Sequence, residues 1–543
     1  MSKIAAYLQE HILGEVSTNA AVLKSLSHDG SVLEIMPEMV VYPRVTNDIR
    51  KVARFAWQLA EKGHVLPLTA RGNGGDQTGA AIGKGVIISL PAHMNRIFEF
   101  DAKQRLVRVQ PGANAQALND ALGLHGVAIP SLPGSSVHNT IGGAVSNNAS
   151  GPLTGRYGLT ENWVHQLEVV LANGDILQTQ RLSRRELSKK KGSQGLEAEI
   201  YREIDNLIED NKELIDKKIG GEIHDNVGYS GIADVKRKDG SFDLTPLIVG
   251  SQGTLGIISE MIMKGEFLST HQGVAAIAFK SHETARDTLD QLEKLEPAFL
   301  EYYRGDLFEL AATSGKQYDF LKNAAVVPEV VVLIGFDDFS DRARRRKLKK
   351  LAKLLKDTDA TLKSLNGEDD DEILAMRDVV SYLLSPQGKD VSAPTLFDGV
   401  YIPRERFEEF SLAAAELAVK HHVVLPLYGR ILENIWCTRP QLHLHKIGDK
   451  QKIFKLLEEY GDLVERFGGH LIGNDGEGRV KARFAYAHLD DDVLQLFAAI
   501  KKIFDPYEIL NPGVKQPSDI RELVSMLRSS YDTVSHPEYL PRS

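Results

Sequence analysis

Cysteine is nearly absent from this sequence: Cys437 is the only one among 543 residues. A single cysteine excludes an intramolecular disulfide, a zinc site built from several thiolates and an iron–sulfur cluster held by this chain alone. Any redox chemistry here must therefore place its electrons on an organic cofactor.

Long apolar runs are absent as well. No stretch approaches the roughly 20 apolar residues that a membrane-spanning helix needs. The opening stretch MSKIAAYLQEHILGEVSTN contains Glu, His and polar breaks where a secretory signal would be continuously apolar. We therefore expect it to be part of the mature protein, and the protein to be cytoplasmic.

The sequence has fewer basic than acidic residues. Its net charge of −9 argues against a nucleic-acid binder. Two basic runs, 184–191 and 342–356, depart from this average. The second run spaces its leucines at helical intervals: Leu348, Leu351, Leu354 and Leu355. This spacing predicts an amphipathic helix with a basic outer face. That face is either simply solvated or docks on the inner surface of a membrane or on an acidic electron-transfer partner.

What the chain does have is enough residues for two or three domains, with 42% hydrophobic and 26% charged residues as in ordinary globular proteins. Short apolar runs alternate with helical stretches, which predicts an α+β fold. We expect a helical segment over 1–35, one domain over 36–268, a second α+β lobe over 269–513 and a loose tail with a short helix over 514–543.

Individual elements can be placed inside these domains. Helix 45–63 is expected to be capped by Thr46 or Asn47 and ended by Gly63, and a hairpin turn is expected at Asn173-Gly174. The other expected elements are a helix over 114–126, strands over 85–90, 105–112 and 165–179, a strand and helix over 273–297, and a strand over 329–338.

Glycine is concentrated in three loops, of which the first reads RGNGGDQTGAAIGKG (71–85). It fails both common phosphate fingerprints. G-x-G-x-x-G would need glycine in place of Gln77, and G-x-x-x-x-G-K-[ST] would need glycine in place of Thr78 and Ser or Thr in place of Gly85. Neither a Rossmann nor a Walker site is supported.

The other two glycine loops are 132–152 and 250–258, and they are also rich in Ser, Thr and Asn. Consecutive amides in such turns form concave nests that bind anions without a lysine. Three such loops in one domain predict an extended ligand with a diphosphate, held mostly by main-chain donors. The alternative is three unrelated surface turns.

Four segments carry a more specific resemblance: RGNGGDQTGAAIGKGVIISL, VQPGANAQALNDALGLHGVAIPSLPGSSVHNTIGGAVSNNASGP, RYGLTENWVHQLEVVLANGDIL and GSQGTLGIISE. In this order they resemble the vanillyl-alcohol-oxidase, or PCMH-type, FAD-binding fold, in the branch of D-lactate dehydrogenase and the glycolate oxidase flavin subunit. The second half resembles the same branch through FDGVYIP, YGRILENIWC, GGHLIGNDGEGRVK and FDPYEILNPG. The resemblance spans roughly residues 8 to 513. It implies a two-lobed PCMH-type FAD-binding domain followed by an α+β substrate (cap) domain.

The resemblance also implies which residues contact FAD. The diphosphate loop would be Arg71, Gly72, Asn73, Gly74, Gly75, Asp76 and Gln77. The flavin side would be lined by Pro133, Gly134, Ser135, Thr140, Ile141, Gly142 and Gly143, and later by Asn148, Gly151 and Tyr157. The adenine would meet the backbone of Gly256, Ile257 and Ile258. Relatives that bond FAD covalently from the first loop use a histidine there; this loop has none, so we expect non-covalent FAD.

Members of this branch transfer a hydride from the α-carbon of a 2-hydroxy acid to flavin N5 and pass electrons to a quinone, cytochrome or partner flavoprotein. Arg377, in MRDVVSYLL, matches the arginine that binds the substrate carboxylate. Its guanidinium fork suits a bidentate carboxylate. The alternative is an ordinary surface arginine on a helix.

Metal-using relatives carry G-H…N-L-H and E-H-G motifs, and this chain departs from both. The positions read Arg430, Trp436-Cys437, Asn474 and Asp475, and only Asn434 is retained. A guanidinium repels a divalent ion, so we predict no metal. Arg430 is then expected to take over the role of the cation and Asp475, with a raised pKa, that of the base. His470, His443 and His445 are reserve candidates, each of which also fits a structural role.

Two functional classes remain open. One is an FAD-linked 2-hydroxy-acid dehydrogenase with a D-lactate-like substrate. The other is a flavin-binding subunit, or a diverged oxidoreductase acting on a larger alcohol or sugar acid without metal-assisted chemistry. Both imply a small-molecule substrate and an electron acceptor, and both are compatible with a homodimer.

Overall fold

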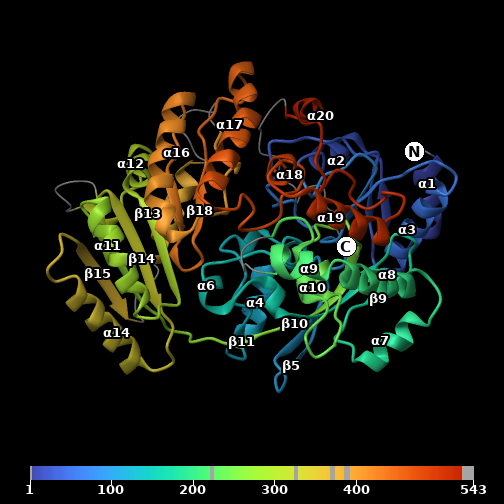
Figure 1. Cartoon of the computed structure of the whole chain (residues 1–543), viewed down its shortest axis with the longest axis horizontal. Helices are drawn as coiled ribbons and strands as arrows, with labels where there is room; N and C mark the ends of the chain where they lie inside the picture. The colour runs from blue at the N-terminus through green and yellow to red at the C-terminus, as the bar shows by residue number, and fades with distance from the viewer. Residues whose placement is uncertain (1–2, 221–225, 323–327, 367–372, 384–391, 529–543) are drawn as a thin grey trace.

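The computed structural model describes residues 3–220, 226–322, 328–366, 373–383 and 392–528. They form two lobes side by side (Figure 1). One contains the blue-to-green and the red parts of the chain and the other the yellow and orange parts. Helices and sheets are mixed in both lobes, as expected for a PCMH-type FAD-binding domain followed by an α+β cap. Within the described residues, no helix is both long and apolar enough to cross a membrane.

The first sheet of the N-terminal lobe has the order β1-β2-β4-β3, in which β2, β4 and β3 are parallel and β1 is antiparallel to β2. Its strands are β1 (Glu15–Ser17), β2 (Met39–Tyr42), β3 (Leu68–Arg71) and β4 (Val86–Ser89). β2 and β4 are buried at every position, which is why they appear in the sequence as uninterrupted apolar runs. The helices of this part are α1 (Lys3–His11), α2 (Ala20–Ser25) and α3 (Thr46–Ala60).

The expected cap of α3 is wrong. Val45 is the N-cap residue, and it has no capping side chain. The hydroxyl of Thr46 donates to Glu168 instead. Helix α3 ends at Ala60, with Gly63 in the left-handed region just beyond it at φ 82°.

The second sheet of this lobe is antiparallel, with the order β5-β6-β10-β8-β9. The strands are β5 (Ile97–Asp101), β6 (Leu106–Val109), β8 (Val164–Val170), β9 (Ile176–Gln178) and β10 (Ile257–Lys264). A separate ribbon pairs β7 (Val127–Ala128) with β11 (Glu266–Phe267). The hairpin at Asn173-Gly174 is confirmed, with Gly174 at φ 83°.

Short helices surround this second sheet. They are α4 (Ala115–Gly123), η1 (Ser136–His138), α5 (Ile141–Ser146), α6 (Thr154–Tyr157), η2 (Thr160–Trp163), α7 (Arg184–Lys191), α8 (Leu196–Asp210), α9 (Lys212–Leu214), η3 (Ile215–Ile219), η4 (Ser230–Asp234) and α10 (Thr245–Ile248). Asn114 caps α4 through its side chain, as a helix-forming sequence at this position predicts.

The second lobe is built on one antiparallel sheet of seven strands in the order β15-β12-β14-β13-β17-β18-β16. The strands are β12 (Gly273–Phe279), β13 (Phe299–Arg304), β14 (Val330–Phe336), β15 (Thr361–Asn366), β16 (Val400–Tyr401), β17 (Leu427–Arg430) and β18 (Ile435–Thr438). Its helical segments are α11 (His282–Glu293), α12 (Gly305–Thr313), α13 (Asp319–Lys322), α14 (Asp341–Leu354), η5 (Ala375–Leu383), η6 (Arg404–Arg406), α16 (Phe407–His421), η7 (Ile431–Glu433) and α17 (Ile447–Arg466).

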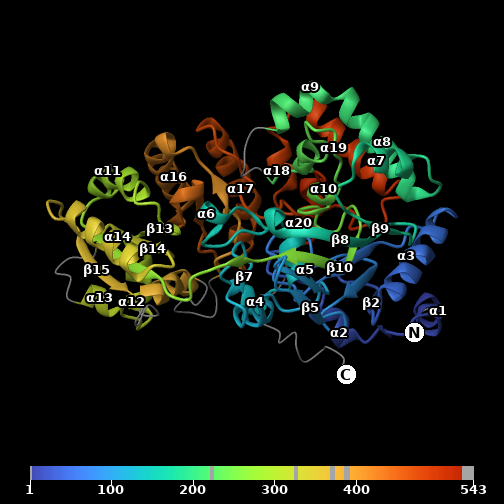
Figure 2. The same cartoon turned by 90° about the horizontal axis from the view of Figure 1, so that it is seen from below.

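The two faces of this sheet are covered by different partners. One face packs on α11, α14, α16 and α17 through alternate residues such as Tyr302 and Val332. The other presents Tyr303 and Val331 to α12 and η5. The short helix α6 of the first lobe also contacts this second face, at β13 and η7 (Figures 1 and 2). A site on that face can therefore receive residues from both lobes.

The chain returns to the first lobe after the second. The C-terminal helices are α18 (Ala482–Tyr486), α19 (Asp491–Phe504) and α20 (Ile520–Ser525). Val493, Leu496 and Phe497 of α19 pack in the core of the five-stranded sheet. Leu510 forms a bridge with Leu68 at the edge of the first sheet. The segment from 491 to 511, which lies in the second domain by sequence, is thus part of the packing of the first.

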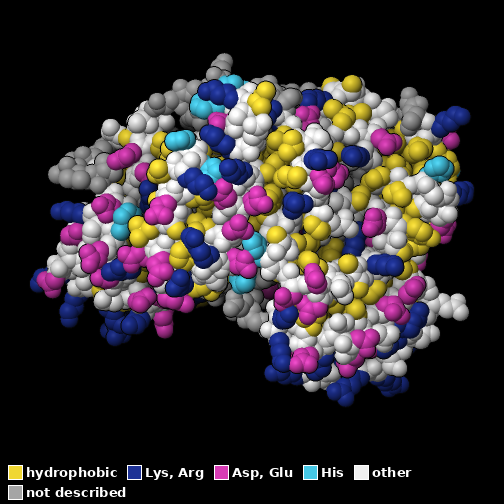
Figure 3. Space-filling model, turned by 45° about the horizontal axis from the view of Figure 1, so that its top comes forward, with side chains coloured by type: hydrophobic (Ala, Val, Ile, Leu, Met, Phe, Trp, Pro, Cys, Tyr) yellow, Lys and Arg dark blue, Asp and Glu magenta, His cyan; other side chains and the backbone are white. Residues whose placement is uncertain are grey.

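The predicted basic amphipathic helix is confirmed as α14. Leu348 and Leu351 are buried, while Arg342, Arg346 and Lys350 are exposed. On the face shown in Figure 3, Lys and Arg are interspersed with Asp and Glu over both lobes. Docking of the basic face of α14 on a membrane or on an acidic partner stays a prediction.

Candidate functional site

The three glycine loops come into direct contact. A Cβ on Gly72 would lie 2.3 Å from Oγ1 of Thr140, and one on Gly75 would lie 2.4 Å from Oδ1 of Asn139. The amide of Gln252, in the third loop, donates to Ser146 O at 2.9 Å. Gly72 and Gly75 are therefore required because the first two loops approach too closely for a side chain.

These loops present a row of free main-chain donors. Within the described chain, none of the amides of residues 73–77 donates a hydrogen bond to protein, and neither do those of Gly134 and Ser135. Gly134 and Gly143 also face open space: a Cβ on Gly134 meets nothing within 4 Å, and one on Gly143 meets only Thr140 Oγ1, at 3.3 Å. Free amides beside open glycines fit an elongated phosphate ligand such as FAD.

The charged side chains of the predicted diphosphate segment, Arg71 and Asp76, are engaged by the protein. Arg71 is 1% exposed, and its guanidinium donates to the carbonyl oxygens of Ala81 and His28 at 3.1 and 2.9 Å. Asp76 accepts hydrogen bonds from the amides of Thr78 and Ala80. Both side chains shape the loop, so only the main chain of these residues is left to meet a ligand.

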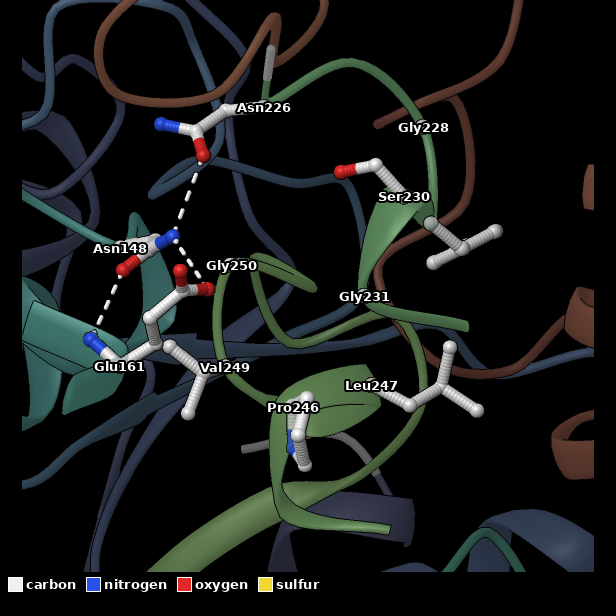
Figure 4. Close-up of a pocket in the computed structure, with 11 residues that line it drawn as sticks. Asn148, Glu161, Asn226, Gly228, Ser230, Gly231, Pro246, Leu247, Val249 and Gly250 are labelled. Carbon is white, nitrogen blue, oxygen red and sulfur yellow. Dashed lines mark hydrogen bonds between the residues drawn. The ribbon is translucent and has the colours of Figure 1, made fainter. Parts of the chain in front are cut away.

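The later loop residues hold the fold around this surface. Asn148, in the left-handed region at φ 46°, donates to Glu161 and Asn226 at 3.0 and 3.1 Å and accepts from the amide of Glu161 (Figure 4). It lines a cavity of about 20 Å³, enough for a single water. A Cβ on Gly151 would lie 2.0 Å from Leu132 O.

The side chains of Tyr157, Ile257 and Ile258, residues also predicted to contact the cofactor, pack against or bond to other parts of the protein. The hydroxyl of Tyr157 donates to Asp337, across the two lobes. Ile257 and Ile258 are buried on β10 in two separate hydrophobic clusters, and a Cβ on Gly256 would lie 2.2 Å from Val169. Of Gly256, Ile257 and Ile258, only main-chain atoms could reach a ligand.

Polar residues gather on the face of the seven-stranded sheet that α6 contacts. The strand register places Glu301 opposite Arg430 and Tyr303 opposite Tyr428, and Tyr428 is in turn opposite Cys437. Directly opposed residues of antiparallel strands point to the same side. A row of acids, phenols and a guanidinium therefore lines one surface between the lobes.

Arg377, from η5, joins this row. Its Nε donates to both carboxylate oxygens of Glu301, at 3.0 and 2.9 Å, and its guanidinium lies over the ring of Phe299 at 4.3 Å. Its Nη2 is buried and has no hydrogen-bond partner among the residues that the structure describes. Burial lowers the pKa of Arg377, but Glu301 outweighs burial and raises it, so the side chain stays charged. An unpartnered donor on a fixed cation can receive a carboxylate oxygen.

Arg430 is held from both lobes. Its Nε donates to Glu433 at 3.0 Å, and its Nη2 donates to Oγ of Ser150, in the loop that follows α5. The Ser150 hydroxyl donates to Oδ1 of Asn474, which also accepts from the amide of Asp475. Burial raises the pKa of Glu433 to about 7, and its Oε1 has no partner.

Asp475 lies in the middle of these charges. Its carboxylate makes no hydrogen bond or ion pair with any described residue. Burial and the nearby Asp76 raise its pKa to about 6, while Lys481 and Arg430 oppose this rise. Its backbone is in the left-handed region, at φ 54°, where a non-glycine residue is strained. A free carboxylate with a pKa near neutrality is suited to accept a proton.

Sequence reasoning missed a second cationic group at the same place. Arg439 pairs with Asp398 at 2.7 Å, and Tyr428 donates to the same carboxylate at 3.1 Å. Lys481 is 3% exposed, donates to Asp398 O at 2.7 Å, and has its pKa lowered by burial. Arg439 could have been found from the two-residue period of β18, which continues from Cys437 to the same face.

Other predicted catalytic residues lie at the margin. Oδ1 of Asn434 accepts from Arg404 at 3.4 Å. His470 stacks on the ring of Tyr401, at a centroid distance of 5.7 Å. His443 and His445 pack against each other in the loop before α17. Among the residues that the structure describes, no three His, Cys, Asp or Glu side chains converge as a metal site.

Comparison with protein-family models gives two matches. Residues 37–180 match the model described as "FAD binding domain" and residues 268–514 the model described as "FAD linked oxidases, C-terminal domain". The two models cover the glycine loops at 71–85 and 132–152 and the polar face of the seven-stranded sheet, respectively.

Curated relatives share about a quarter of their residues with this chain. D-2-hydroxyglutarate dehydrogenase of Pantoea ananatis (strain AJ13355) is 26% identical over 538 residues, 96% of this chain and 52% of the relative. The chain thus spans about half the length of this relative. Glycolate oxidase subunit GlcD of Bacillus subtilis (strain 168) is 25% identical over 90% of this chain and 91% of the relative. D-lactate dehydrogenase of Archaeoglobus fulgidus is 25% identical over 88% and 90%, respectively.

Solved structures share the fold. 4-ethylphenol oxidase from Gulosibacter chungangensis superposes with a TM-score of 0.68 at 15% identity, covering 95% of this chain and 97% of the other. Alkyldihydroxyacetonephosphate synthase superposes with a TM-score of 0.64 at 14% identity, covering 94% and 86%.

Proposed function

Because the chain belongs to the PCMH-type FAD-binding oxidoreductase family, we propose that it oxidises a 2-hydroxy acid to the 2-oxo acid on the polar face between its two lobes. FAD is the cofactor of this family, and when bound it supplies the acceptor for the hydride on the substrate α-carbon. The observation that carries the proposal is the pair of unengaged groups there: Nη2 of Arg377 and the carboxylate of Asp475.

FAD would be held mainly by main-chain donors. The amides of residues 73–77 would receive the diphosphate, and Gly134, Ser135 and Gly143 would line the flavin side. Their amides or open Cβ directions support this assignment. The guanidinium of Arg71 donates to carbonyl oxygens of the protein, so we assign its side chain a role in holding the loop and not in binding FAD. The first loop offers no histidine, which supports non-covalent binding.

The chain's own residues would divide the work in a simple way. Arg377 binds the substrate carboxylate through its free Nη2, while Glu301 fixes its orientation. Asp475 takes the proton from the substrate hydroxyl as the hydride leaves the α-carbon. The negative charge that forms on the hydroxyl oxygen is stabilised by the nearby guanidinium of Arg430. Electrons then pass to a quinone, cytochrome or flavoprotein partner.

The finer proposal is a substrate with a second acidic group. Among the described residues, the buried amine of Lys481 makes a single hydrogen bond, to a carbonyl oxygen, and the charge of neighbouring Asp398 is matched by Arg439. A buried, unmatched cation favours an anionic ligand. The names of the D-2-hydroxyglutarate dehydrogenase relatives point the same way. A D-lactate-like substrate, or a larger alcohol or sugar acid, are the alternatives.

The test is anaerobic bleaching of the flavin absorbance of the purified holoprotein by a panel of acids. The panel contains glycolate, D- and L-lactate, D- and L-2-hydroxyglutarate, and several sugar acids. Full bleaching by a 2-hydroxy acid, faster for the dicarboxylate, is expected. If only sugar acids bleach the flavin, the substrate is a sugar acid and not a simple 2-hydroxy acid. If no acid of the panel bleaches it, the proposed reaction is wrong.

A further inference from the structure

The residues at the site do not fit the divalent metal that the family resemblance implies. A metal needs several converging oxygen, nitrogen or sulfur atoms with free lone pairs. The carboxylate of Asp475 and Oε1 of Glu433 are free acceptors, but among the described residues no three His, Cys, Asp or Glu side chains converge on one point. Arg430 offers only donors, and Oδ1 of Asn474 already accepts from Ser150 and from the amide of Asp475. Oδ1 of Asn434 is directed to Arg404 instead.

The same residues do form a continuous hydrogen-bond chain around one fixed positive charge. It runs from Glu433 to Arg430, to Ser150, to Asn474, and every link is a hydrogen bond. Glu433 is 2% exposed and Ser150 is 5% exposed, so these two members are shielded from water, while the side chain of Arg430 is 19% exposed. The N–H of Nε and one N–H of Nη2 of Arg430 are occupied, which leaves the two N–H groups of Nη1 and the second one of Nη2 as donors for a ligand.

Ser150 has a special place in this chain. It is the link supplied by the first lobe, while Arg430, Glu433 and Asn474 come from the second part of the sequence. It lies seven residues after Gly143, which the proposed function assigns to the flavin side. The position of the guanidinium relative to the flavin loop is therefore set through the hydroxyl of Ser150.

We propose that this is a metal-free centre in which Arg430 is the fixed cation beside the substrate oxygens and Ser150 is the residue that positions it. The inference rests on the proposed function for the identity of the substrate. It goes further in assigning the positive charge to a side chain and in naming a positioning residue from the other lobe. Low local dielectric strengthens the interaction of such a held charge with an anionic oxygen.

A binding experiment tests this without turnover. The holoprotein, treated with chelator and containing no added metal, is titrated with oxalate, and the shift of the flavin absorbance is followed. Wild type is expected to bind oxalate under these conditions. Ser150→Ala and Arg430→Lys are each expected to weaken binding by about tenfold or more, the size of one lost charged hydrogen bond. Ser150→Thr, which retains the hydroxyl, is expected to bind oxalate with an affinity close to that of wild type.

Ser241→Ala is the matched control. Its hydroxyl also accepts from an arginine, Arg181, and donates to a side-chain oxygen, that of Asp239, but on a hairpin outside the site. It is expected to bind oxalate as wild type does. FAD content and melting temperature are measured for every variant, so that a folding defect is separated from a binding defect.

Chemical rescue gives a second readout for the role of the Arg430 guanidinium. In Arg430→Ala, added guanidinium is expected to restore oxalate binding, and zinc or manganese is not. Oxalate binding that requires a divalent metal in wild type, or that is unchanged in both Ser150→Ala and Arg430→Lys, would overturn the inference. Either result leaves the bleaching test of the proposed function standing, because that test is scored with whatever metal the protein carries.

Discussion

Nε of Arg377 donates to both carboxylate oxygens of Glu301, at 3.0 and 2.9 Å, although 76 positions separate the two residues in the sequence. The pair holds the guanidinium over the ring of Phe299 and leaves Nη2 without a partner. Glu301 is thus a residue of the proposed site that the family resemblance did not indicate, and the role proposed for it is to orient the arginine rather than to touch the substrate.

This pair gives the first prediction. Arg377→Lys retains the charge but loses the planar fork, so kcat/KM for the hydroxy acid should fall by about ten- to a hundredfold, mainly through KM. Rates of anaerobic flavin reduction at several substrate concentrations measure both constants. Arg105→Lys is the control, because Arg105 also pairs with a glutamate, Glu266, and lies over a phenylalanine ring, Phe267. Equal KM values for Arg377→Lys and wild type would remove Arg377 from substrate binding.

The second prediction concerns the base. With a pKa raised to about 6, Asp475 is protonated and inactive at low pH, so kcat/KM should rise as pH increases through about 6 and level off above it. Asp475→Asn should lose about a hundredfold in rate and lose this limb of the pH profile. Asparagine tolerates the left-handed backbone at this position, so the loop should keep its shape.

Glu508→Gln is the control for that variant, since Glu508 is exposed and has the same φ of 54°. It should keep the wild-type pH profile. If Asp475→Asn also keeps the limb near pH 6, the proton goes elsewhere, and Glu433, with a pKa raised to about 7, becomes the candidate to test.

The third prediction separates two adjacent glycines. A Cβ on Gly142 would lie 2.5 Å from Cβ and 2.7 Å from O of Pro111, so Gly142→Ala should destabilise the fold. A Cβ on Gly143 meets only Thr140 Oγ1, at 3.3 Å, so Gly143→Val should fold and lose bound FAD because its side chain occupies the flavin side. Melting temperature and FAD released per chain measure the two effects. Normal FAD content in Gly143→Val would place the cofactor elsewhere.

The fourth prediction is non-covalent FAD. Acid precipitation of the yellow protein should leave all flavin in the supernatant, with the chromatographic mobility of FAD. The reason is that the first glycine loop carries no histidine to form the bond used by covalent relatives. Flavin that stays with the precipitated protein would contradict the prediction, and the exposed His138, whose carbonyl oxygen accepts from Asn73, would then be the residue to replace first.

Local sequence determined the elements of this protein well. The strands at β4 and β12, the helices α4 and α14 and the hairpin at Asn173-Gly174 follow from periodicity, capping and turn residues within short windows. Ordered motifs fixed the FAD-binding family and its cofactor. These features depend on neighbours in the chain, which a sequence displays directly.

Long-range contacts decided what local rules could not. α3 begins at Thr46, whose hydroxyl donates to Glu168 instead of capping the helix, and the carboxylate of Asp48 in its first turn accepts from the amides of Leu13, Gly14 and Arg44, outside the helix. In the same way, Arg377 was predicted but Glu301 was not, and Arg430 was predicted but Ser150 was not. A motif identifies a residue type at a position, whereas its partner is selected by the packing of distant segments.

The sequence alone therefore determined that this chain folds as an α+β flavoprotein, and it predicted which loops approach the cofactor. Only the tertiary structure decided how the charges on the polar face of the seven-stranded sheet are arranged. Ser150 and Arg430 meet across 280 positions of the chain because α6 and the loop before it lie against the face of the seven-stranded sheet that α12 and η5 also cover. Electrostatic interactions depend on distance in space and on exclusion of water, and neither quantity is contained in the order of the residues.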